Sequence, residues 1–216
     1  MVDANGGWGA YSSFRNSWDF FGAKNEFVRH QLGAMPMEDW YVNALAGVSP
    51  KVDISVTPLK NAQGQPVTVI GGQAWAVPKG AKHPEQACAL AKAMTATDTW
   101  VTAATAKANA VRAEGNVYTG SFTGNVAADE KIMSTVYEPS GVAALDQGVK
   151  VIEQLQTVAS PSPASLAGRP VTTAYEQAVT RVMEGKQAPQ AAMAQAQKEA
   201  QKALDDAAAA FDRQGS

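Results

Sequence analysis

Segments that could form β-strands are scarce in this sequence, which limits the folds open to it. From about residue 140 onward, apolar residues recur at helical spacing in three stripes, within 142–152, 175–182 and 193–211. We expect all three stripes to face a core. Upstream there are only two or three short β-branched runs, too few for a self-sufficient sheet. The sequence therefore predicts an α/β chain dominated by helices, with part of its sheet missing.

The stretch VTVIGGQAWAVPKGAKHPEQA, residues 67–87, passes from strand to helix composition through two glycines. Its β-branched residues predict a short buried strand over 67–70. Inside a strand, Gly71 and Gly72 would each cost roughly 0.5–1 kcal/mol relative to alanine, so a tight bend or a ligand close to the backbone should compensate. Pro84 suits the first turn of the helix that follows.

Other local patterns predict the remaining elements of the first half. We expect a short strand over 34–37, followed by a helix. Alternating apolar residues predict a half-buried strand over 52–56, and the composition of 60–66 predicts a turn. Thr97 and Asp98 are suited to cap the next helix.

Composition excludes several classes of protein. The net charge of −2 and a pI near 5.7, without any lysine or arginine run, make nucleic acid an unexpected partner. A single cysteine, Cys88, excludes an internal disulfide and a thiolate zinc cluster, and we expect it to be a small buried hydrophobe. There is no membrane-spanning apolar run and no export signal in the first thirty residues. We therefore expect either that the chain is not exported or that its signal lies upstream.

The sequence shows no pattern typical of an enzyme. The two histidines, His30 and His83, have no nucleophile or carboxylate motif nearby. The adjacent acids at 38–39 and 205–206 diverge on a helix and make poor acid–base pairs. The glycines of 6–14 do not follow a strand and do not match a phosphate-binding loop. We expect no catalytic residue, no metal ligand and no cofactor.

Three stretches, in this order, resemble a known family. The first stretch is FVRHQLGAMPMEDW (27–40). It contains a phenylalanine, a glycine, the pair Ala-Met and a tryptophan in the order and spacing of the family, in which the tryptophan lies in the ligand cleft. Residues 53–95 have a strand, a TPLP-like loop with Lys60 in place of a proline, a Gly-Gly turn, and Pro-Lys-Gly before a helix. Residues 174–204 are similar to a closing helix pair. Over 26–211 the chain resembles the C-terminal half of the extracellular solute-binding proteins of sugar-type ABC importers, bacterial family 1, which are maltose-binding-protein-like.

This resemblance implies a periplasmic-binding-protein-like fold of two α/β lobes, of which this chain would be an incomplete C-terminal portion. Residues 1–25 would be an N-terminal lead-in segment. Because the family's chain crosses between the lobes, 26–64 and 140–211 would belong to the C-terminal lobe and 67–124 to the N-terminal lobe. The tail 212–216 is expected to fray.

The resemblance also implies a ligand site in the cleft between the lobes. An aromatic ring would stack on the apolar face of a sugar, and polar groups would bind its hydroxyls. Each candidate has a simpler explanation: the tryptophans could be core residues, the glycines could form a tight turn, and the arginine could be an ordinary surface residue. The candidate ligand-binding residues are Trp40, Tyr41, Gly71, Gly72, Gln73, Trp75 and Arg169.

The expected function is therefore non-covalent capture of a sugar or oligosaccharide and its delivery to ABC permease subunits in the membrane. The resemblance implies an extracellular or periplasmic location, a lipoprotein anchor and a monomer when full length. Two alternatives stay open. The same fold could bind another polar solute, such as a polyol phosphate or a polyamine, or the tail from Pro189 could be part of a helical interaction module that packs on a partner or on a second copy.

Overall fold

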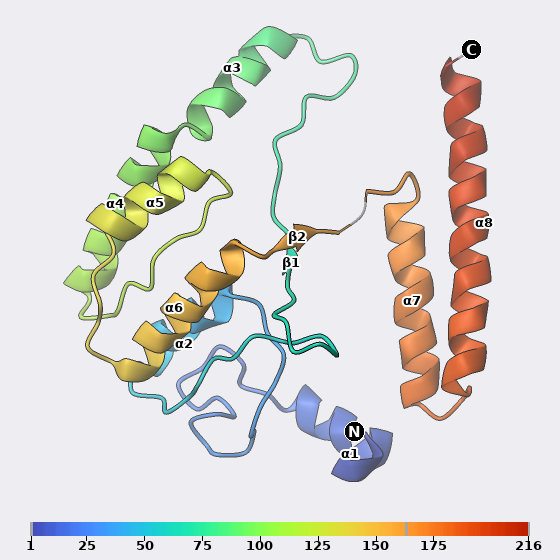
Figure 1. Cartoon of the computed structure of the whole chain (residues 1–216), viewed down its shortest axis with the longest axis horizontal. Helices are drawn as coiled ribbons and strands as arrows, with labels where there is room; N and C mark the ends of the chain where they lie inside the picture. The colour runs from blue at the N-terminus through green and yellow to red at the C-terminus, as the bar shows by residue number, and fades with distance from the viewer. Residues whose placement is uncertain (1, 163, 216) are drawn as a thin grey trace. The chain divides into compact units, whose positions relative to one another are not determined.

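The computed structural model describes residues 2–162 and 164–215, which separate into two compact units. The first unit takes the described residues of Met1–Trp18 and Ser162–Ser216, and the second is Asp19–Pro161. Most of the regular structure in both units is helical (Figure 1). The helix-dominated character expected from the sequence is confirmed.

The first unit contains a 3-10 helix and three α-helices. Gly185 has a φ of 71° in the left-handed region and follows α7, and α8 opens on Pro189, a residue suited to the first helical turn. Helix α8 continues to Gly215 and so includes residues expected to fray. The elements are η1 (Asp3–Asn5), α1 (Gly7–Asn16), α7 (Gly168–Met183) and α8 (Pro189–Gly215).

Small side chains form the contact between α7 and α8, which lie side by side in Figure 1. Ala178 and Ala192 are fully buried, and Ala174 and Ala196 are almost so. The expectation that the apolar stripes of these helices belong wholly to the core is therefore wrong. The alanines occupy the contact, and larger residues of the stripes face solvent: Tyr175, Met193, Leu204 and Phe211.

Replacing Ala178 by leucine is expected to destabilise this hairpin by about 1–3 kcal/mol, because three added heavy atoms have no space between the helices. Urea denaturation followed by far-UV circular dichroism measures the change. The control is Ala194→Leu on the exposed face of α8, which should shift the free energy of unfolding by less than about 0.5 kcal/mol. Equal effects of the two substitutions would contradict the alanine contact.

The second unit packs five helices and a minimal sheet. Helix α6 packs on α2 through Val42, Ala46, Leu145 and Ile152, and the apolar stripe predicted over 142–152 forms this contact. The helices are α2 (Trp40–Val48), α3 (Pro84–Met94), α4 (Thr97–Ala113), α5 (Val126–Thr135) and α6 (Ala143–Gln156), and the strands are β1 (Val69–Ile70) and β2 (Ser160–Pro161).

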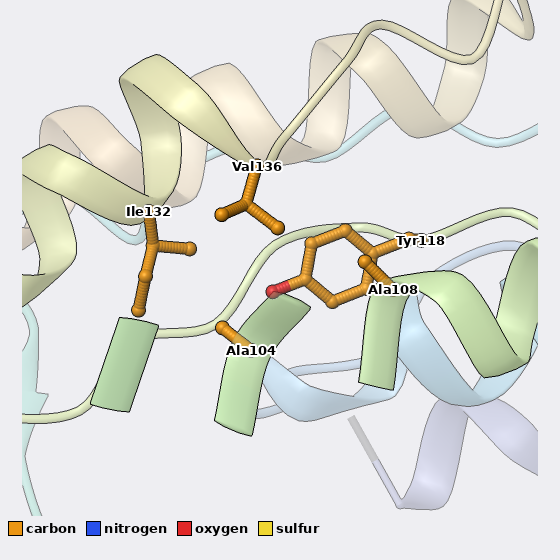
Figure 2. Packing of buried hydrophobic residues seen from close by; sticks show 5 residues of the cluster. All are labelled: Ala104, Ala108, Tyr118, Ile132 and Val136. Atoms are coloured by element: carbon orange, nitrogen blue, oxygen red, sulfur yellow. The ribbon is translucent and has the colours of Figure 1, made fainter. Parts of the chain in front are cut away.

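A separate apolar core lies between α4 and α5 (Figure 2). Ala104 and Ala108 come from α4, Ile132 from α5, and Val136 directly follows α5. The ring of Tyr118, from the irregular segment that joins the two helices, lies among them as Figure 2 shows. The Tyr118 side chain therefore ties this segment to the core.

Residues 52–56 form an extended segment that belongs to no strand. Its burial alternates as predicted, with Val52 buried and Ile54 and Val56 half-buried. Gln147 of α6 takes the place of a neighbouring strand: its Oε1 accepts a hydrogen bond from the Val56 N–H (2.9 Å), and its Nε2 donates to the Val56 carbonyl (2.7 Å). A side-chain amide thus satisfies the backbone groups that a sheet would otherwise pair.

Several predictions about strands and burial are wrong. Residues 34–37 form no strand. The strand predicted as buried over 67–70 is present as β1, but Val69 and Ile70 are 68% and 41% exposed. The reason is that β1 pairs in parallel with a partner of two residues, and so small a sheet offers no covered face. Cys88 on α3 is exposed rather than buried.

The N-terminus of α4 also differs from the prediction. The N-cap residue is Ala96, which has no side-chain oxygen to offer, so Thr97 and Asp98 already lie within the helix. The Asp98 carboxylate instead accepts a hydrogen bond from Lys131 of α5 (3.1 Å). Asp98 therefore links two helices instead of capping one.

Asp146 fixes the turn between α5 and α6. Its Oδ1 accepts hydrogen bonds from the Ser140 N–H and hydroxyl, both at 2.8 Å, and from the Tyr137 hydroxyl at 3.4 Å, and its Oδ2 accepts from the Gly141 N–H at 3.0 Å. Burial acts to raise the pKa of Asp146, but these donors outweigh it and lower the pKa. Burial, together with the Asp146 charge, raises the pKa of Tyr137 to about 12.

Asp146→Asn is expected to destabilise the second unit by about 1–2 kcal/mol at pH 7, because the ionised carboxylate is the better acceptor. Since the folded pKa lies below the unfolded one, this stabilisation is present above about pH 4 and is lost as the pH falls through the folded pKa. Urea titrations should therefore show that the wild type and the variant differ less in free energy of unfolding at pH 3 than at pH 7. Glu130→Gln on the exposed face of α5 serves as control, and a pH-independent loss in Asp146→Asn would contradict the assignment.

Candidate functional site

Two exposed aromatic rings, those of Phe21 and Trp40, lie together at the N-terminal end of α2. Their centroids are 5.8 Å apart and their planes are inclined by only 24°. Trp40 is 43% exposed and Phe21 is 62% exposed. We refer to these two residues as the ring pair. The two rings stack on one another, and the parts of both rings that are not covered by this contact are apolar and exposed to solvent, at the first residue of a helix.

Two further aromatic residues support the ring pair. The Phe20 ring stacks on Tyr41 with centroids 4.7 Å apart and meets Trp40 edge-on at 6.2 Å. The Tyr41 hydroxyl donates a hydrogen bond to the Phe20 carbonyl (3.1 Å). Burial raises the pKa of Tyr41, and the negative Glu26 raises it further, which keeps this hydroxyl protonated as a donor. The neighbours of Trp40 are therefore fixed by packing and by a hydrogen bond.

Buried polar side chains hold the segment that carries Phe21. The Glu26 carboxylate accepts a hydrogen bond from the Asp19 N–H (2.8 Å). Asn25, fully buried, donates from Nδ2 to the Gly22 carbonyl (3.0 Å) and to the Ser49 hydroxyl (3.2 Å). The second of these bonds joins the segment to the C-terminal end of α2. Phe21 is thus presented by a loop with a defined conformation.

The predicted site residues on α2 have different environments. Trp40 is exposed, as a stacking residue must be. Tyr41 is only 5% exposed, and its ring contacts those of Phe20 and Phe27 and meets Trp40 edge-on. The ligand-binding role of each of these two residues stays a prediction.

Gly71, Gly72, Gln73 and Trp75 follow β1 in one exposed, extended stretch, with Trp75 58% exposed. At Gly71 and Gly72 the backbone is outside the left-handed region, and a Cβ would meet no atom of the described chain within 4 Å. Backbone conformation and crowding therefore do not require glycine at these two positions. Because these two residues have no side chains, a ligand can reach their backbone amides.

Arg169 belongs to the other unit. It is exposed in the first turn of α7 and lines a groove of about 430 Å³ between α7 and α8, together with Thr173, Gln177 and Glu199. The other predicted residues all lie in the second unit. The predicted residues of the second unit therefore form two local groups. One is Trp40 with Tyr41, and the other is Gly71, Gly72, Gln73 and Trp75.

Sequence reasoning missed the partner of Trp40. Phe21 stands in a series of aromatic residues spaced three or four apart, and that spacing alone does not show which of them meets Trp40, nineteen positions further on. The sequence carries no signal that distinguishes Phe21 from the other aromatic residues of this segment.

The ring pair and the stretch after β1 both offer non-covalent contacts. The ring pair provides an apolar face for C–H groups, and the stretch after β1 provides backbone amides and one side-chain amide. Within the described residues, no group of histidine, cysteine, aspartate or glutamate side chains could hold a metal ion. The helices there are also too short or too polar for any of them to cross a bilayer.

Comparison with family models gives one match that covers the ring pair and the stretch after β1. Residues 1–133, out of 216, match the bacterial extracellular solute-binding protein model. The match begins before the resemblance expected over 26–211 and ends within α5. Comparisons with curated proteins and with solved structures give no match. Since the family match spans more than half of the chain, this protein belongs to the bacterial extracellular solute-binding proteins.

Proposed function

We propose that the protein is the substrate-binding component of an ABC importer and that it captures a sugar or oligosaccharide without covalent chemistry. Family membership supports the capture of a solute outside the cytoplasm for transport. The observation that favours a carbohydrate is the ring pair, because Phe21 and Trp40 offer exposed apolar ring surface and contact the rings of Phe20 and Tyr41. A pyranose ring has an apolar C–H face that such a surface fits.

Polar contacts to the sugar hydroxyls come, in this proposal, from the stretch after β1. The backbone amides of Gly71 and Gly72 donate to hydroxyls, and the Gln73 side chain both donates and accepts. Trp75 offers a second ring. Arg169, in the other unit, stays a separate candidate, whose planar guanidinium suits vicinal hydroxyls. The exposure of these residues supports the assignment, since a ligand can reach each of them.

The proposal includes the two-lobe organisation predicted from the sequence. Residues 26–64 and 140–211 contribute to one lobe, and residues 67–124 contribute to the other. The ligand lies in the cleft between the lobes, and closure of the cleft presents a surface that the permease subunits recognise. A lipoprotein anchor and a monomeric state when full length belong to the same proposal.

Isothermal titration calorimetry of the full chain with a panel of ligands tests the carbohydrate assignment. The panel contains mono- and oligosaccharides, a polyol phosphate and a polyamine. We expect binding of at least one saccharide and no heat from the other two classes. Binding of the polyol phosphate or the polyamine alone would replace the carbohydrate assignment with another polar solute while leaving the family unchanged.

A helical interaction module is the second candidate function, and the α7–α8 hairpin favours it. The alanine contact leaves Tyr175, Met193, Leu204 and Phe211 exposed on this hairpin, and apolar side chains of this size are typical of surfaces that meet a partner. Light scattering separates the two candidates. A stable oligomer that does not change with saccharide, and that Leu204→Ser converts to a monomer, would favour the interaction module.

A further inference from the structure

A groove of about 480 Å³ lies in the second unit, at the opposite end of α2 from the ring pair. Trp40 opens the helix and Ser49 follows its last residue, so the nine residues of α2 separate the two places by about 13 Å along its axis. Phe27, Val28 and His30, from residues 27–30, form one wall, and residues 49–53 form the other. The volume falls within the range of small-molecule sites in proteins.

Hydrogen bonds hold the two walls of the groove in place. Asn25 donates to the Ser49 hydroxyl, which joins the walls, and its Oδ1 accepts from the Val28 N–H at 3.2 Å. His30 lies on the first wall with a φ of 54°, and it is the one non-glycine residue of the described chain with a positive φ. Left-handed backbone is costly for such a residue and persists where its surroundings fix it. The groove is therefore formed before a ligand arrives.

Apolar residues and opposite charges line the groove together. Phe27, Val28, Pro50 and Val52 supply the apolar surface. Lys51 and Asp53, two positions apart, both line the groove and are both exposed. Within the described part of the chain, neither of these charges forms an ion pair.

These groups fit a ligand that carries both charges and an apolar body. The Lys51 ammonium attracts a carboxylate, while Asp53 and the carbonyl-rich C-terminus of α2 attract an ammonium group. A ligand with both charges can interact with Lys51 and Asp53 at once, whereas a ligand with a single charge attracts only one of them and a purely apolar ligand attracts neither. We propose that the groove formed by residues 27–30 and 49–53 is a second binding site, which takes a free α-amino acid with an apolar side chain.

Calorimetry of the full chain with L-phenylalanine and L-leucine tests this site. We expect saturable binding of both amino acids. 3-Phenylpropionate lacks the ammonium group and phenethylamine lacks the carboxylate, so each should bind at least about tenfold more weakly than phenylalanine. No heat from either amino acid at millimolar concentration, or equal binding of the two analogues, would overturn the proposal.

Substitutions of Lys51 and Asp53 test whether their charges bind the amino acid. Lys51→Met and Asp53→Asn should each weaken phenylalanine binding about tenfold or more, whereas Lys82→Met and Asp205→Asn on exposed positions elsewhere should not. Unchanged melting curves show that the fold is retained. Trp40→Ala should leave phenylalanine binding intact, and a saccharide should not compete with it. Loss of phenylalanine binding in Trp40→Ala would mean that the ligand occupies the ring pair instead, and would overturn the second site without touching the proposed function.

Discussion

Replacing Leu145 by alanine is expected to destabilise the second unit by about 2–5 kcal/mol, the range for truncation of a fully buried leucine. Leu145 has no exposed surface and packs in the cluster that joins α6 to α2. Val56, from the extended segment, and Phe122, from the segment between α4 and α5, pack against the same cluster. The cluster that contains Leu145 thus connects four parts of the chain that are distant in sequence.

Leu90→Ala on α3 is the matched control, because Leu90 is 55% exposed and the same atoms are removed. Its effect should stay below about 1 kcal/mol. Urea denaturation followed by far-UV circular dichroism gives both free energies of unfolding. Because α2 carries Trp40, the Leu145 variant should also change tryptophan fluorescence at lower urea concentration than the wild type does. Similar losses in the two variants would show that the α2–α6 contact contributes little.

Local patterns in the sequence predicted the elements that local forces decide. Helix α3 begins at Pro84, as expected from the geometry of proline. The turn predicted over 60–66 is present, with the Asn61 N–H donating to the Gln65 carbonyl (2.9 Å) and Gly64 at a φ of 78°. The stripe 142–152 faces the core because its period matches that of a helix.

Burial and strand pairing could not be read in the same way, since both depend on partners far away in sequence. Residues 67–70 have strand composition, but whether a strand is covered depends on what packs over it, and β1 meets only the two residues of β2. The α7–α8 contact shows the same limit. The stripes of α7 and α8 contain both alanines and large residues. The alanines form the contact because the two helices pack along the side that carries them, and the hydrophobicity of each residue alone does not show which side that is.

The candidate site was predicted only in part, because it too depends on contacts between residues that are distant in sequence. Trp40 was identified from its place in a family pattern, and its exposure at the start of α2 agrees with that role. Phe21 could not be identified, because its contact with Trp40 depends on the fold of residues 19–32, which buried Asn25 and Glu26 determine. Whether any of these residues binds a ligand stays a prediction for experiment.

Trp40→Ala is expected to weaken saccharide binding by about ten- to a hundredfold. Loss of one buried aromatic contact costs about 1.5–3 kcal/mol, and each 1.4 kcal/mol is a factor of ten in affinity. The melting temperature should change little, since Trp40 is 43% exposed and Tyr41 and Phe20 keep their own stacking and hydrogen bond. Calorimetry with the saccharide that binds the wild type measures the loss in affinity.

Two further variants make the result specific to the ring surface of Trp40. Trp40→Phe keeps an aromatic face of smaller area beside Phe21, so it should retain more affinity than Trp40→Ala. Trp75→Ala removes an equally large exposed ring from the stretch after β1 and shows whether that ring also contacts the sugar. If Trp40→Ala bound the saccharide as tightly as the wild type, the ring pair would not be the sugar platform. If Trp75→Ala alone lost affinity, the platform would lie in the stretch that follows β1, where bare glycine backbone adjoins an exposed indole.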